Sequence, residues 1–390
     1  MRWFGFGFNA FGQIYVHVKS TEVESYDDED VKVSSPTELA TSRDCRLNTV
    51  EEVKASWSRR AFLQLDGDRC VYLAGFGAVP SSNESCGVPM KHTDGCTDVF
   101  ISESCLTLGF SDRVEVWDLL KEEKTPSWSM EMKTQSETSG TRLNLPLVPG
   151  GYIAMKPPFY RPLSQHLKAK SLALSAEHAI LLTASGVVYT WGAGSHGQLG
   201  HGGLTSEEDP RVVEALWGMP MNCVAAGGWH SVCISDGGDL YVWGWNETGQ
   251  LGLPSRGLRK AQQQQQQAGA GASCQHAGTT PTDEPQEGEK NEDVFISIQA
   301  FPALLDVTPS CEVKTVSCGF RHTAAVTTKG ELYTWGWGDY GQLGHQSLVS
   351  SDEPQCVEFF REKQLHVVDV VCGAWNTFAA VVKKDVETSS

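Results

Sequence analysis

Three stretches of this sequence align with one another without gaps, and this repetition constrains the fold more than any other feature. They span residues 175–202, 227–254 and 319–346, and each contains the pattern Trp-Gly-x-x-x-x-Gly-Gln-Leu-Gly. Trp191 and Trp243 are 52 residues apart, and the next equivalent tryptophan follows after the same period plus an insertion of 40 residues. A unit of this size, repeated along a chain, indicates an architecture that grows by stacking.

Each unit predicts a small antiparallel sheet. In the second copy, apolar and polar residues alternate over 231–234 and again over 240–243, and Asp236-Gly237 lies between them as a tight hairpin turn. The glycines after the tryptophan let the chain turn sharply before its next strand. A sheet of about 50 residues cannot bury both of its faces alone, so we expect the units to stack as propeller blades or solenoid rungs.

The ends of the chain favour a closed ring. Residues 6–14 match the second half of a unit, with Phe6 in the tryptophan place and Gln13 in the place of Gln198. Residues 371–381 match the first half, with Asn376 in the place of His230. Together these halves complete one blade, which predicts an all-β, single-domain β-propeller over residues 1–390, closed by pairing of the N- and C-terminal strands.

The number of blades follows less directly. Weaker hairpins lie in 57–77 and 106–117, so anchors near positions 6, 74, 117, 191, 243 and 335 indicate six blades. A seventh could lie within 121–170. With 390 residues and 40% hydrophobic composition, the chain is able to bury the core of either ring.

Composition and charge exclude several classes of protein. The formal net charge is −17, which disfavours a broad DNA-binding face. The 12 cysteines form no CxxC pair or regular disulfide framework, which favours reduced thiols in the nucleus or cytosol. No apolar stretch approaches the ~20 residues of a membrane span, and the N-terminal sequence lacks the pattern of a signal peptide. We expect no membrane contact and a protein that is monomeric by itself.

Two glycine-rich motifs match the dinucleotide pattern GxGxxG but are interpreted as turns. They lie at 192–197 and 336–341, and neither leads into a helix. A pyrophosphate site needs such a helix, because the N–H groups of its first turn bind the phosphates. We therefore predict no cofactor. No nucleophile, acid–base pair or triad has a context that supports catalysis, so we expect no enzyme activity.

The repeated histidines and tryptophans are interpreted as structural. Three histidines could suggest a metal site, but each occupies the same place in a different unit, which favours a hydrogen bond within each blade. The tryptophans are predicted to pack between blades. Small apolar residues four positions before the histidine place, such as Cys318 and Cys372, should lie near the ring axis. The structural repeat residues are His178, Trp191, His230, Trp243, His322 and Trp335.

Segments outside the repeat are where individual function is expected, because loops on a rigid ring vary without damaging its blades. Residues 255–293 combine a glutamine run with acidic residues and predict a disordered, low-complexity insertion. Residues 26–30 form a shorter acidic stretch. Residues 121–162 predict an irregular loop, in which 142–150 is either an exposed extended peptide that binds a partner or a linker between blades. The candidate contact residues are Arg142, Leu143, Leu145, Pro146, Leu147, Phe159, Tyr160 and Arg161.

The repeat resembles that of the regulator of chromosome condensation family. The motif Trp-Gly-x-x-x-x-Gly-Gln-Leu-Gly after a Gly-x-x-His strand carries the resemblance, most strongly over 171–254 and 313–382. Members of this family are usually seven-bladed propellers, which favours seven blades here. Finer features, among them the opening Trp3-Phe4-Gly5-Phe6 and the closing Cys372-Gly373-Ala374-Trp375, are similar to one member in particular.

That finer resemblance implies a function. It implies a non-enzymatic platform in the nucleus, on chromosomes and possibly also in the cytoplasm, that binds a JmjC-domain oxygenase linked to histone H3 lysine 36 methylation and chromosome stability. The iron and 2-oxoglutarate would belong to that partner, and Arg142 becomes a candidate docking or hydroxylation target. Two alternatives stay open: guanine-nucleotide exchange on a small GTPase, and direct binding of histones. The founding member binds nucleosomes through a basic N-terminal tail, and no such tail precedes the first blade here.

Overall fold

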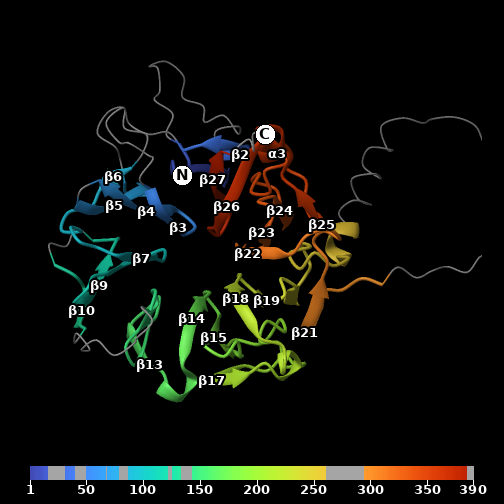
Figure 1. Ribbon diagram of the computed structural model, residues 1–390, viewed down its shortest axis with the longest axis horizontal. Coiled ribbons are helices and arrows are strands. Elements are labelled where there is room, and N and C mark those ends of the chain that lie inside the picture. The colour runs from blue at the N-terminus through green and yellow to red at the C-terminus, as the bar shows by residue number, and fades with distance from the viewer. Residues whose placement is uncertain are drawn as a thin grey trace, which may run out of the picture.

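The chain forms a ring of seven small sheets around a central channel (Figure 1). The computed structural model describes residues 1–15, 31–39, 50–66, 68–78, 87–121, 125–132, 143–260 and 294–383. Six of these sheets have four strands and one has three, and neighbouring strands pair antiparallel throughout the described residues. The predicted all-β propeller is confirmed, and its blades number seven.

The closing blade, blade 1, contains both ends of the propeller. Its strands are β1 (Arg2–Phe8), β2 (Lys32–Glu38), β26 (Leu365–Cys372) and β27 (Asn376–Lys383). Strand β1 pairs with β27 from Arg2↔Val381 to Gly7↔Asn376, so a strand from each end of the chain lies in this one blade (Figure 1). Trp3 and Phe6 of β1 are 1% and 0% exposed. The predicted closure of the ring by its terminal strands is therefore confirmed.

The remaining blades follow in chain order around the ring. Blade 2 is β3 (Val50–Ala55), β4 (Arg59–Asp66), β5 (Asp68–Gly75) and β6 (Val88–Pro89); blade 3 is β7 (Asp98–Ile101), β8 (Cys105–Gly109), β9 (Arg113–Asp118) and β10 (Trp128–Glu131); blade 4 is β11 (Leu147–Val148), β12 (Gly151–Ile153) and β13 (Tyr160–Pro162). Blade 5 is β14 (Ala169–Leu174), β15 (His178–Thr183), β16 (Val188–Gly192) and β17 (Glu207–Val212); blade 6 is β18 (Met221–Ala226), β19 (His230–Ser235), β20 (Leu240–Trp245) and β21 (Ile298–Leu305); blade 7 is β22 (Val313–Cys318), β23 (His322–Thr327), β24 (Leu332–Gly336) and β25 (Ser351–Cys356).

The second strand of each regular blade is buried along its whole length. Every residue of β15, β19 and β23 is buried, although their side chains alternate between the two faces of the sheet. Each blade packs between two neighbours, so both faces of its middle strands are covered. The large apolar side chains on these strands form core clusters between neighbouring blades, such as those between blades 5 and 6 and between blades 6 and 7.

The segment 121–162 differs from the expected irregular loop. It contains β10 of blade 3 and all of blade 4. Blade 4 is the seventh blade, which has none of the six sequence anchors. Strands of two or three residues are too short to show an alternating pattern, and proline at Pro146 and Pro162 further obscures them in the sequence. Blade 4 therefore had no recognisable repeat signal.

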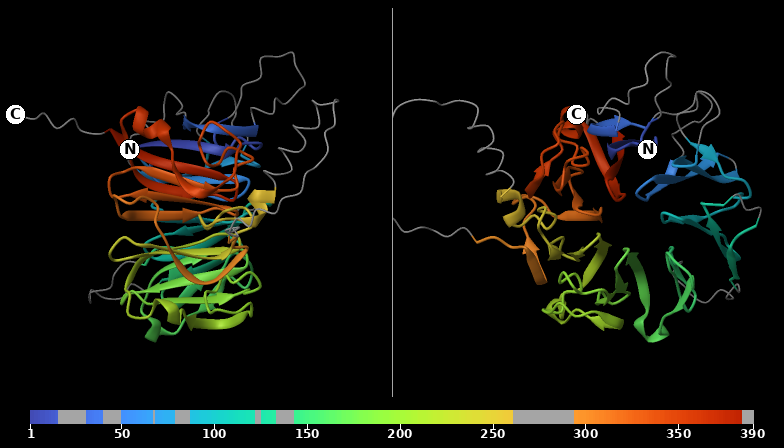
Figure 2. Two further views of the ribbon diagram at one scale, coloured as in Figure 1. Left: turned by 90° about the vertical axis from the view of Figure 1, so that its right-hand side faces the viewer. Right: turned by 180° about the vertical axis from the view of Figure 1, so that it is seen from behind.

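One edge strand of each four-stranded blade lines the central channel, namely β3, β7, β14, β18, β22 and β26, and strands of the closing blade run along the ring axis (Figure 2). Ala226, Cys318 and Cys372 line this channel, as their small size predicted. Short helices lie between strands, among them Gln165–Leu167, Glu214–Leu216 and α3 (Glu358–Glu362). None of the helices in the described ranges has the length and hydrophobicity that crossing a bilayer requires. The acidic stretch 26–30 and most of the 255–293 insertion lie outside the described residues.

Candidate binding face

Two loops meet at the same end of each regular blade and bring variable residues of the repeat together. The first loop precedes the histidine place, and the second follows the tryptophan place. In blade 6 the backbone N–H of Trp245 donates to the carbonyl of Trp229 at 2.9 Å, and in blade 1 the N–H of Phe8 donates to the carbonyl of Trp375 at 2.8 Å. Residues immediately before the histidine place and two after the tryptophan place therefore lie side by side.

Aromatic residues occupy these positions in several successive blades and form one connected surface, which we call the aromatic arc. Its rings run from blade 5 through blades 6, 7 and 1 to blade 2, each in contact with at least one other. The arc consists of His196, Trp229, Trp245, Phe320, Trp337, Trp375, Tyr340, Phe8, Phe11, Trp57 and Phe76.

The contacts within the arc are close and mostly edge-to-face. Ring centroids of Trp229 and Phe320 are 4.8 Å apart, those of Phe320 and Trp375 are 5.3 Å apart, and those of Trp375 and Trp337 are 4.8 Å apart. Such pairs hold one another in place, which gives a rigid surface. Trp57 is 46% exposed and Phe76 is 51% exposed. Exposed aromatic rings gathered on one face are typical of protein-binding surfaces.

Two arginines contact the arc in different ways. Arg59 is 4% exposed, donates from Nε to the carbonyl of Phe76 at 3.0 Å, and hydrogen-bonds the carbonyl of Glu103. Its guanidinium is therefore satisfied within the protein. Arg321 instead places its guanidinium 5.0 Å from the ring centre of Trp245 and 5.9 Å from that of Trp229. Burial lowers the pKa of Arg321 below its ordinary value.

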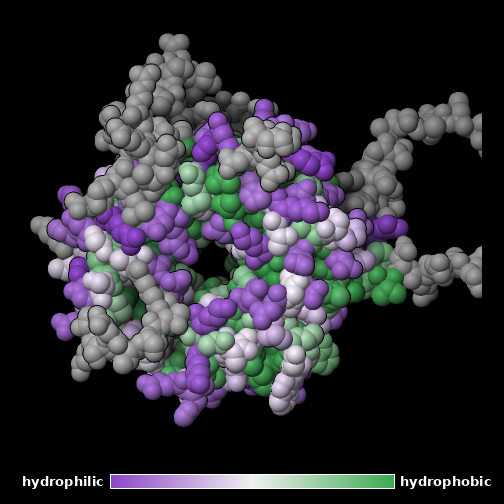
Figure 3. All heavy atoms as spheres, in the orientation of Figure 1, coloured by the Kyte–Doolittle hydropathy of each residue, from purple (hydrophilic) through white to green (hydrophobic). Residues whose placement is uncertain are grey.

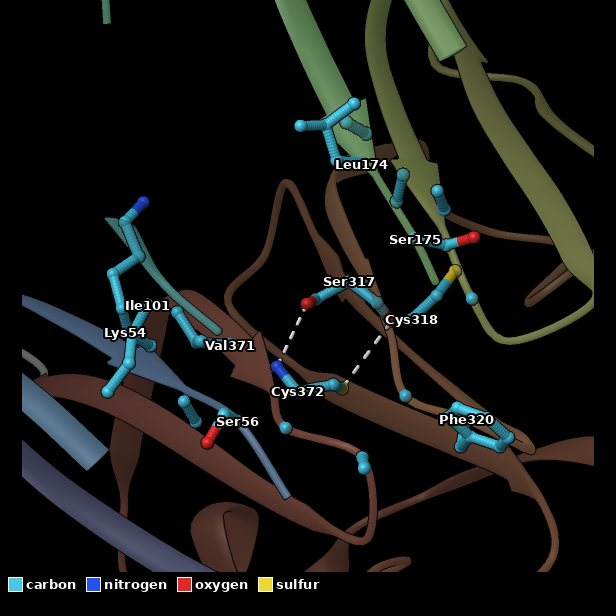
Figure 4. Close-up of a pocket in the computed structure, with 18 of the residues that line it drawn as sticks. Lys54, Ser56, Ile101, Leu174, Ser175, Ser317, Cys318, Phe320, Val371 and Cys372 are labelled. Carbon is cyan, nitrogen blue, oxygen red and sulfur yellow. Dashed lines mark hydrogen bonds between the residues drawn. The ribbon is translucent and has the colours of Figure 1, made fainter. Parts of the chain in front are cut away.

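The arc borders the mouth of the central channel. The channel holds a cavity of about 670 Å³, and Trp57, Phe320 and Trp375 belong to both its lining and the arc. The centre of the ring is open in the space-filling view (Figure 3). Figure 4 shows Lys54, Cys318 and Cys372, from three different blades, around this cavity. A chain segment bound across the arc would therefore reach the channel.

Charged residues lie on the channel side of blades 1 to 3. The ammonium of Lys54 is 2.7 Å from the Glu52 carboxylate. Burial, helped by the nearby charge of Glu52, raises the pKa of Asp98 to about 6, and burial also raises the pKa of Asp369. The Asp98 carboxylate accepts a hydrogen bond from the backbone N–H of Leu145 at 2.6 Å, which joins blade 3 to the chain entering blade 4.

The repeated histidines bond to the next blade, whereas a hydrogen bond within each blade was expected. His178 also has the expected bond, since its Nδ1 lies 2.9 Å from the Ser175 hydroxyl, but the Nδ1 atoms of His230 and His322 have no such partner in the described residues. The Nε2 atoms of His178, His230 and His322 lie 2.8, 2.9 and 2.9 Å from the hydroxyls of Ser231, Thr323 and Thr377, respectively. The histidine begins the second strand of its blade, and the hydroxyl lies on the second strand of the following blade. This register makes the imidazole a link between blades.

The hydroxyl fixes the tautomer of each histidine. Thr323 donates its only hydroxyl proton to the carbonyl of Gln250 at 2.7 Å, so it accepts its second bond from the Nε2–H of His230. The imidazoles are fully buried, and burial lowers the pKa of His178, His230 and His322 to about 3. They are neutral at physiological pH, and within the described residues no group of side chains is arranged to hold a metal ion.

The repeated tryptophans join the same junctions. The indole N–H groups of Trp243 and Trp335 donate to the carbonyls of Gln198 and Gln250, at 2.8 and 3.1 Å. Each of these carbonyls thus accepts from both a hydroxyl and an indole of the following blade. Trp191 packs in the core between blades 4 and 5, with its ring 5.9 Å from that of Tyr152.

The glycine three residues before each histidine allows this arrangement. A Cβ atom added to Gly227 would lie 2.1 Å from Cε1 of His230, and one added to Gly319 would lie 2.0 Å from Cε1 of His322. Any side chain at these places would displace the imidazole. The Gly-x-x-His spacing in the repeat therefore reflects close packing of the loop backbone against the imidazole.

The candidate partner peptide is largely part of blade 4. Leu147 is 2% exposed in β11, and Pro146 and Leu145 line the channel, so 143–148 is not an exposed extended peptide. Leu143 packs against the core between blades 4 and 5. Arg142 lies outside the described residues.

The second part of that candidate set lies in the same blade. Phe159 and Tyr160 pack against the core between blades 3 and 4, and Arg161 is exposed on the outer strand β13. Register pairs Arg161 with Tyr152 of β12, and Ile153 of that strand bonds back to Pro146 at 2.8 Å. The structure therefore brings the two parts of the predicted set together, in a mainly structural setting.

The aromatic arc was missed by the sequence interpretation, although a signal was present. The chain has 12 tryptophans, and only three occupy the core tryptophan place of the clear repeats. Trp229, Trp245, Trp337 and Trp375 lie at variable positions of the repeat, where a core role does not require an indole. Aligning the repeats by position and asking which variable positions are aromatic would have found the surface.

Comparison with known proteins identifies the family. The description "Regulator of chromosome condensation (RCC1) repeat" matches residues 185–234 and 329–380, and a second description of the same repeat matches 169–198, 222–250 and 313–342. The chain is 41% identical to the RCC1 domain-containing protein 1 of Mus musculus over 410 aligned residues, covering 98% of this chain and 97% of that protein. The Homo sapiens protein of the same name is also 41% identical, with the same coverage.

A solved structure shows the same fold. The crystal structure of Prp20p from Saccharomyces cerevisiae, described with its binding properties to Gsp1p and histones, superposes with a TM-score of 0.67 at 16% identity. The match covers 99% of this chain and 92% of that one. Repeat pattern, blade architecture and near full-length identity agree, and this chain belongs to the regulator of chromosome condensation repeat family.

Proposed function

We propose that this propeller is a non-enzymatic platform that binds a JmjC-domain oxygenase at chromatin, in the nucleus. The aromatic arc is the observation that carries the platform role. It offers a rigid surface of aromatic rings at one end of the blades, next to the channel mouth. Aromatic side chains supply large contact area at low entropic cost and dominate many protein interfaces.

The identity of the partner rests on the family resemblance. The chain is 41% identical to the RCC1 domain-containing protein 1 of two mammals across nearly its full length. The finer sequence features that carry the resemblance include Trp3 and Trp375, which lie in the closing blade, and Trp375 belongs to the arc. The partner's activity is linked to histone H3 lysine 36 methylation and chromosome stability, with its own iron and 2-oxoglutarate.

Arg142 is the second part of this proposal. It directly precedes Leu143 in the sequence. We propose it as a docking or hydroxylation target of the oxygenase. Incubation of the full chain with that enzyme, iron and 2-oxoglutarate, followed by mass spectrometry, should show one added oxygen at Arg142 and none in Arg142→Lys.

Affinity purification tests the platform role. The full chain should retain the oxygenase, and the double variant Trp229→Ala with Trp375→Ala should lose most of it, because both rings are central to the arc. Trp217→Ala is the matched control. Trp217 is 81% exposed and follows the helix Glu214–Leu216, near the hairpin-turn end of blades 5 and 6. Equal retention by the wild type and the double variant would contradict a role of the arc.

Direct histone binding is the second candidate, and charge favours it. The chain carries a net charge of −17, and histones are basic, so attraction would operate even without the oxygenase. Retention of free histones by the isolated chain, weakened by added salt, would support this alternative.

Guanine-nucleotide exchange is the third candidate function. Accelerated release of labelled GDP from a small GTPase by substoichiometric protein would replace the platform proposal.

A further inference from the structure

Arg321 is the one charged residue at the centre of the arc, and its surroundings differ from those of other arginines in the ring. It occupies the position before the histidine place in blade 7, where blade 6 has Trp229 and blade 1 has Trp375. Its guanidinium reaches back toward blade 6 and lies over Trp229 and Trp245. The arc therefore holds a cation at fixed depth between aromatic rings.

The guanidinium has no acidic partner in the part of the chain that the structure describes. Its Nε atom is buried and has no hydrogen-bond partner there. The exposed arginines Arg211 and Arg361, in contrast, pair with Glu207 and Glu358 at 2.5 Å. Burial alone accounts for the lowered pKa of Arg321, with no carboxylate close enough to raise it.

An unpaired, partly buried guanidinium favours an incoming anion. Aromatic rings attract the cation but leave its N–H groups without acceptors in the ring plane. A carboxylate can accept two parallel hydrogen bonds from a guanidinium, and such charge-assisted bonds are stronger where water is partly excluded. The donors of Arg321 are therefore matched to a planar anion on a partner.

The neighbouring rings indicate what else the anion carries. Phe320 lies against Trp229 on one side of this site, and His196 lies against Trp229 and Trp245 on the other. Apolar groups on both sides of the bound anion would pack on these rings. A nucleic acid is disfavoured, since the chain's net charge of −17 repels a polyanion. A single acidic side chain flanked by apolar side chains meets both conditions.

We propose that Arg321, with Trp229 and Trp245, is a carboxylate-binding subsite that receives an acidic residue, flanked by apolar residues, from an extended segment of a protein partner. The subsite adds detail to the proposed function. It rests on that function only for the identity of the natural partner. The arc supplies apolar contact, and Arg321 sets the position and the charge of the residue that docks on it. Specificity then comes from the unpaired cation, and affinity comes mainly from the rings.

The test uses three acetylated and amidated tripeptides that differ only in their middle residue: leucine–glutamate–leucine, leucine–glutamine–leucine and leucine–lysine–leucine. Binding to the full chain is measured from the indole N–H resonances of the tryptophans. The glutamate peptide should bind at least about 5-fold more tightly than the glutamine peptide, and more tightly still than the lysine peptide. This preference should disappear in Arg321→Gln, be partly retained in Arg321→Lys, and be unchanged in the control Arg211→Gln.

Several outcomes would overturn the proposal. They are no saturable binding of the glutamate peptide up to the millimolar range, equal affinity for the glutamate and glutamine peptides, preference for the lysine peptide, or a preference that survives in Arg321→Gln. Arg321→Lys keeps the test decisive if the glutamine variant does not fold. No oxygenase is present in this assay, so failure of the partner assignment leaves the peptide result intact and the two proposals are tested separately.

Discussion

The junctions between blades differ in two parts of the ring: one part comprises blades 5, 6, 7 and 1, and the other comprises blades 2, 3 and 4. At the first three junctions, a buried imidazole bonds a hydroxyl of the next blade, and that hydroxyl donates to a glutamine carbonyl. In blades 2 and 3 the histidine place holds Arg59 and Cys105. Their backbone carbonyls accept from the N–H groups of Ser56 and Ser102, three residues earlier, as the carbonyls of the repeated histidines accept from the residue three positions before them. These junctions rely on apolar side chains and on individual polar contacts.

The difference shows why the repeat is strong in one half of the ring and weak in the other. A buried polar network is stable only when all of its members are present, because removing one leaves another buried and unsatisfied. Histidine, hydroxyl and tryptophan therefore recur as a set around a backbone carbonyl. An apolar junction accepts many combinations of similar volume, so its sequence leaves no clear repeat.

The largest expected effect comes from deleting residues 1–14. The deletion tests whether blades 5, 6, 7 and 1, which we call the network half, depend on the closing strand β1. The deletion removes the partner strand of β27 and the buried side chains Trp3, Phe4, Phe6 and Ile14. Burial of each is worth about 1.5–3 kcal/mol, which together approaches the whole stability of a typical domain. We expect the cooperative melting transition in circular dichroism to be lost.

Arg2→Ala is the control for this deletion, because it removes only an exposed ion pair with Glu38. It should leave the melting temperature nearly unchanged. A truncated chain that melts like the intact protein would show that the closing strand does not hold the ring together.

Acid should destabilise the network half next most strongly. In the unfolded chain, His178, His230 and His322 take up protons below their ordinary pKa of 6.5, whereas in the folded chain they stay neutral down to about 3. The unfolded state therefore binds more protons in this window, and the free energy of unfolding falls as pH falls. Well below pH 6.5, each histidine lowers the free energy of unfolding by about 1.4 kcal/mol per pH unit, so the three together lower it by about 4 kcal/mol per pH unit.

Urea unfolding between pH 7 and pH 5 measures this slope. Asp98 and Asp369, whose folded pKa values are raised, oppose part of it, so the sharper measurement is the change on substitution. His230→Asn should reduce the slope by about 1 kcal/mol per pH unit averaged between pH 7 and pH 5, and by about 1.4 kcal/mol per pH unit at the lower end of this range. Asn376 of the closing blade shows that an amide fits this place. An unaltered slope would mean that this imidazole is not held neutral.

Leu147→Ala tests the degenerate half. Leu147 is 2% exposed in the three-stranded blade 4, and its loss should cost about 2–5 kcal/mol. Strand β11 pairs with β12 at only two positions, so we expect faster amide hydrogen exchange confined to 143–163. Leu182→Ala in β15 removes a buried leucine from the core between blades 5 and 6, and exchange should rise across these two blades together. The same pattern for both variants would remove the distinction between the two halves.

The smallest effect should come from a single link of the network. Thr323→Val keeps the shape but removes the hydroxyl between His230 and the backbone carbonyl of Gln250. The Nε2–H of His230 then loses its acceptor, and the carbonyl keeps only the bond from the Trp335 indole. We expect a loss of about 1–3 kcal/mol in the free energy of unfolding measured with denaturant. Thr323→Ser retains the hydroxyl, as Ser231 does at the preceding junction, and should restore most of the stability. Equal losses for the two variants would assign the effect to packing.

Much of the fold could be predicted, and the reasons for the failures are specific. The alternation within each unit and the split repeat at the two ends were sufficient for the blades and their closure. Blade 4 was not recognised, because its strands have only two or three residues. The proline-rich stretch before it was interpreted as an irregular loop, although Leu147 and Pro146 are buried there. Proline excludes a helix but permits a short strand at its edge.

The candidate site was harder to predict than the fold. Its rings come from nine loops of five blades, and no local pattern relates Phe76 to Trp229. The histidine bonds were assigned within a blade for the same reason, since the hydroxyl that accepts His230 is 93 residues further along the chain. Contacts between blades depend on the radial order of strands, which a single repeat does not reveal.

By itself, the sequence determined the repeating unit, its hairpin and the closure of the ring, because these depend on residue spacing and on which positions are apolar. Tertiary structure alone decided which variable positions face one another across blades, and hence the aromatic arc and the unpaired guanidinium of Arg321. Local periodicity sets the conformation of a strand, whereas a surface depends on how separate strands are brought together. Trp229, Trp245 and Arg321 became one site only when blades 6 and 7 packed side by side.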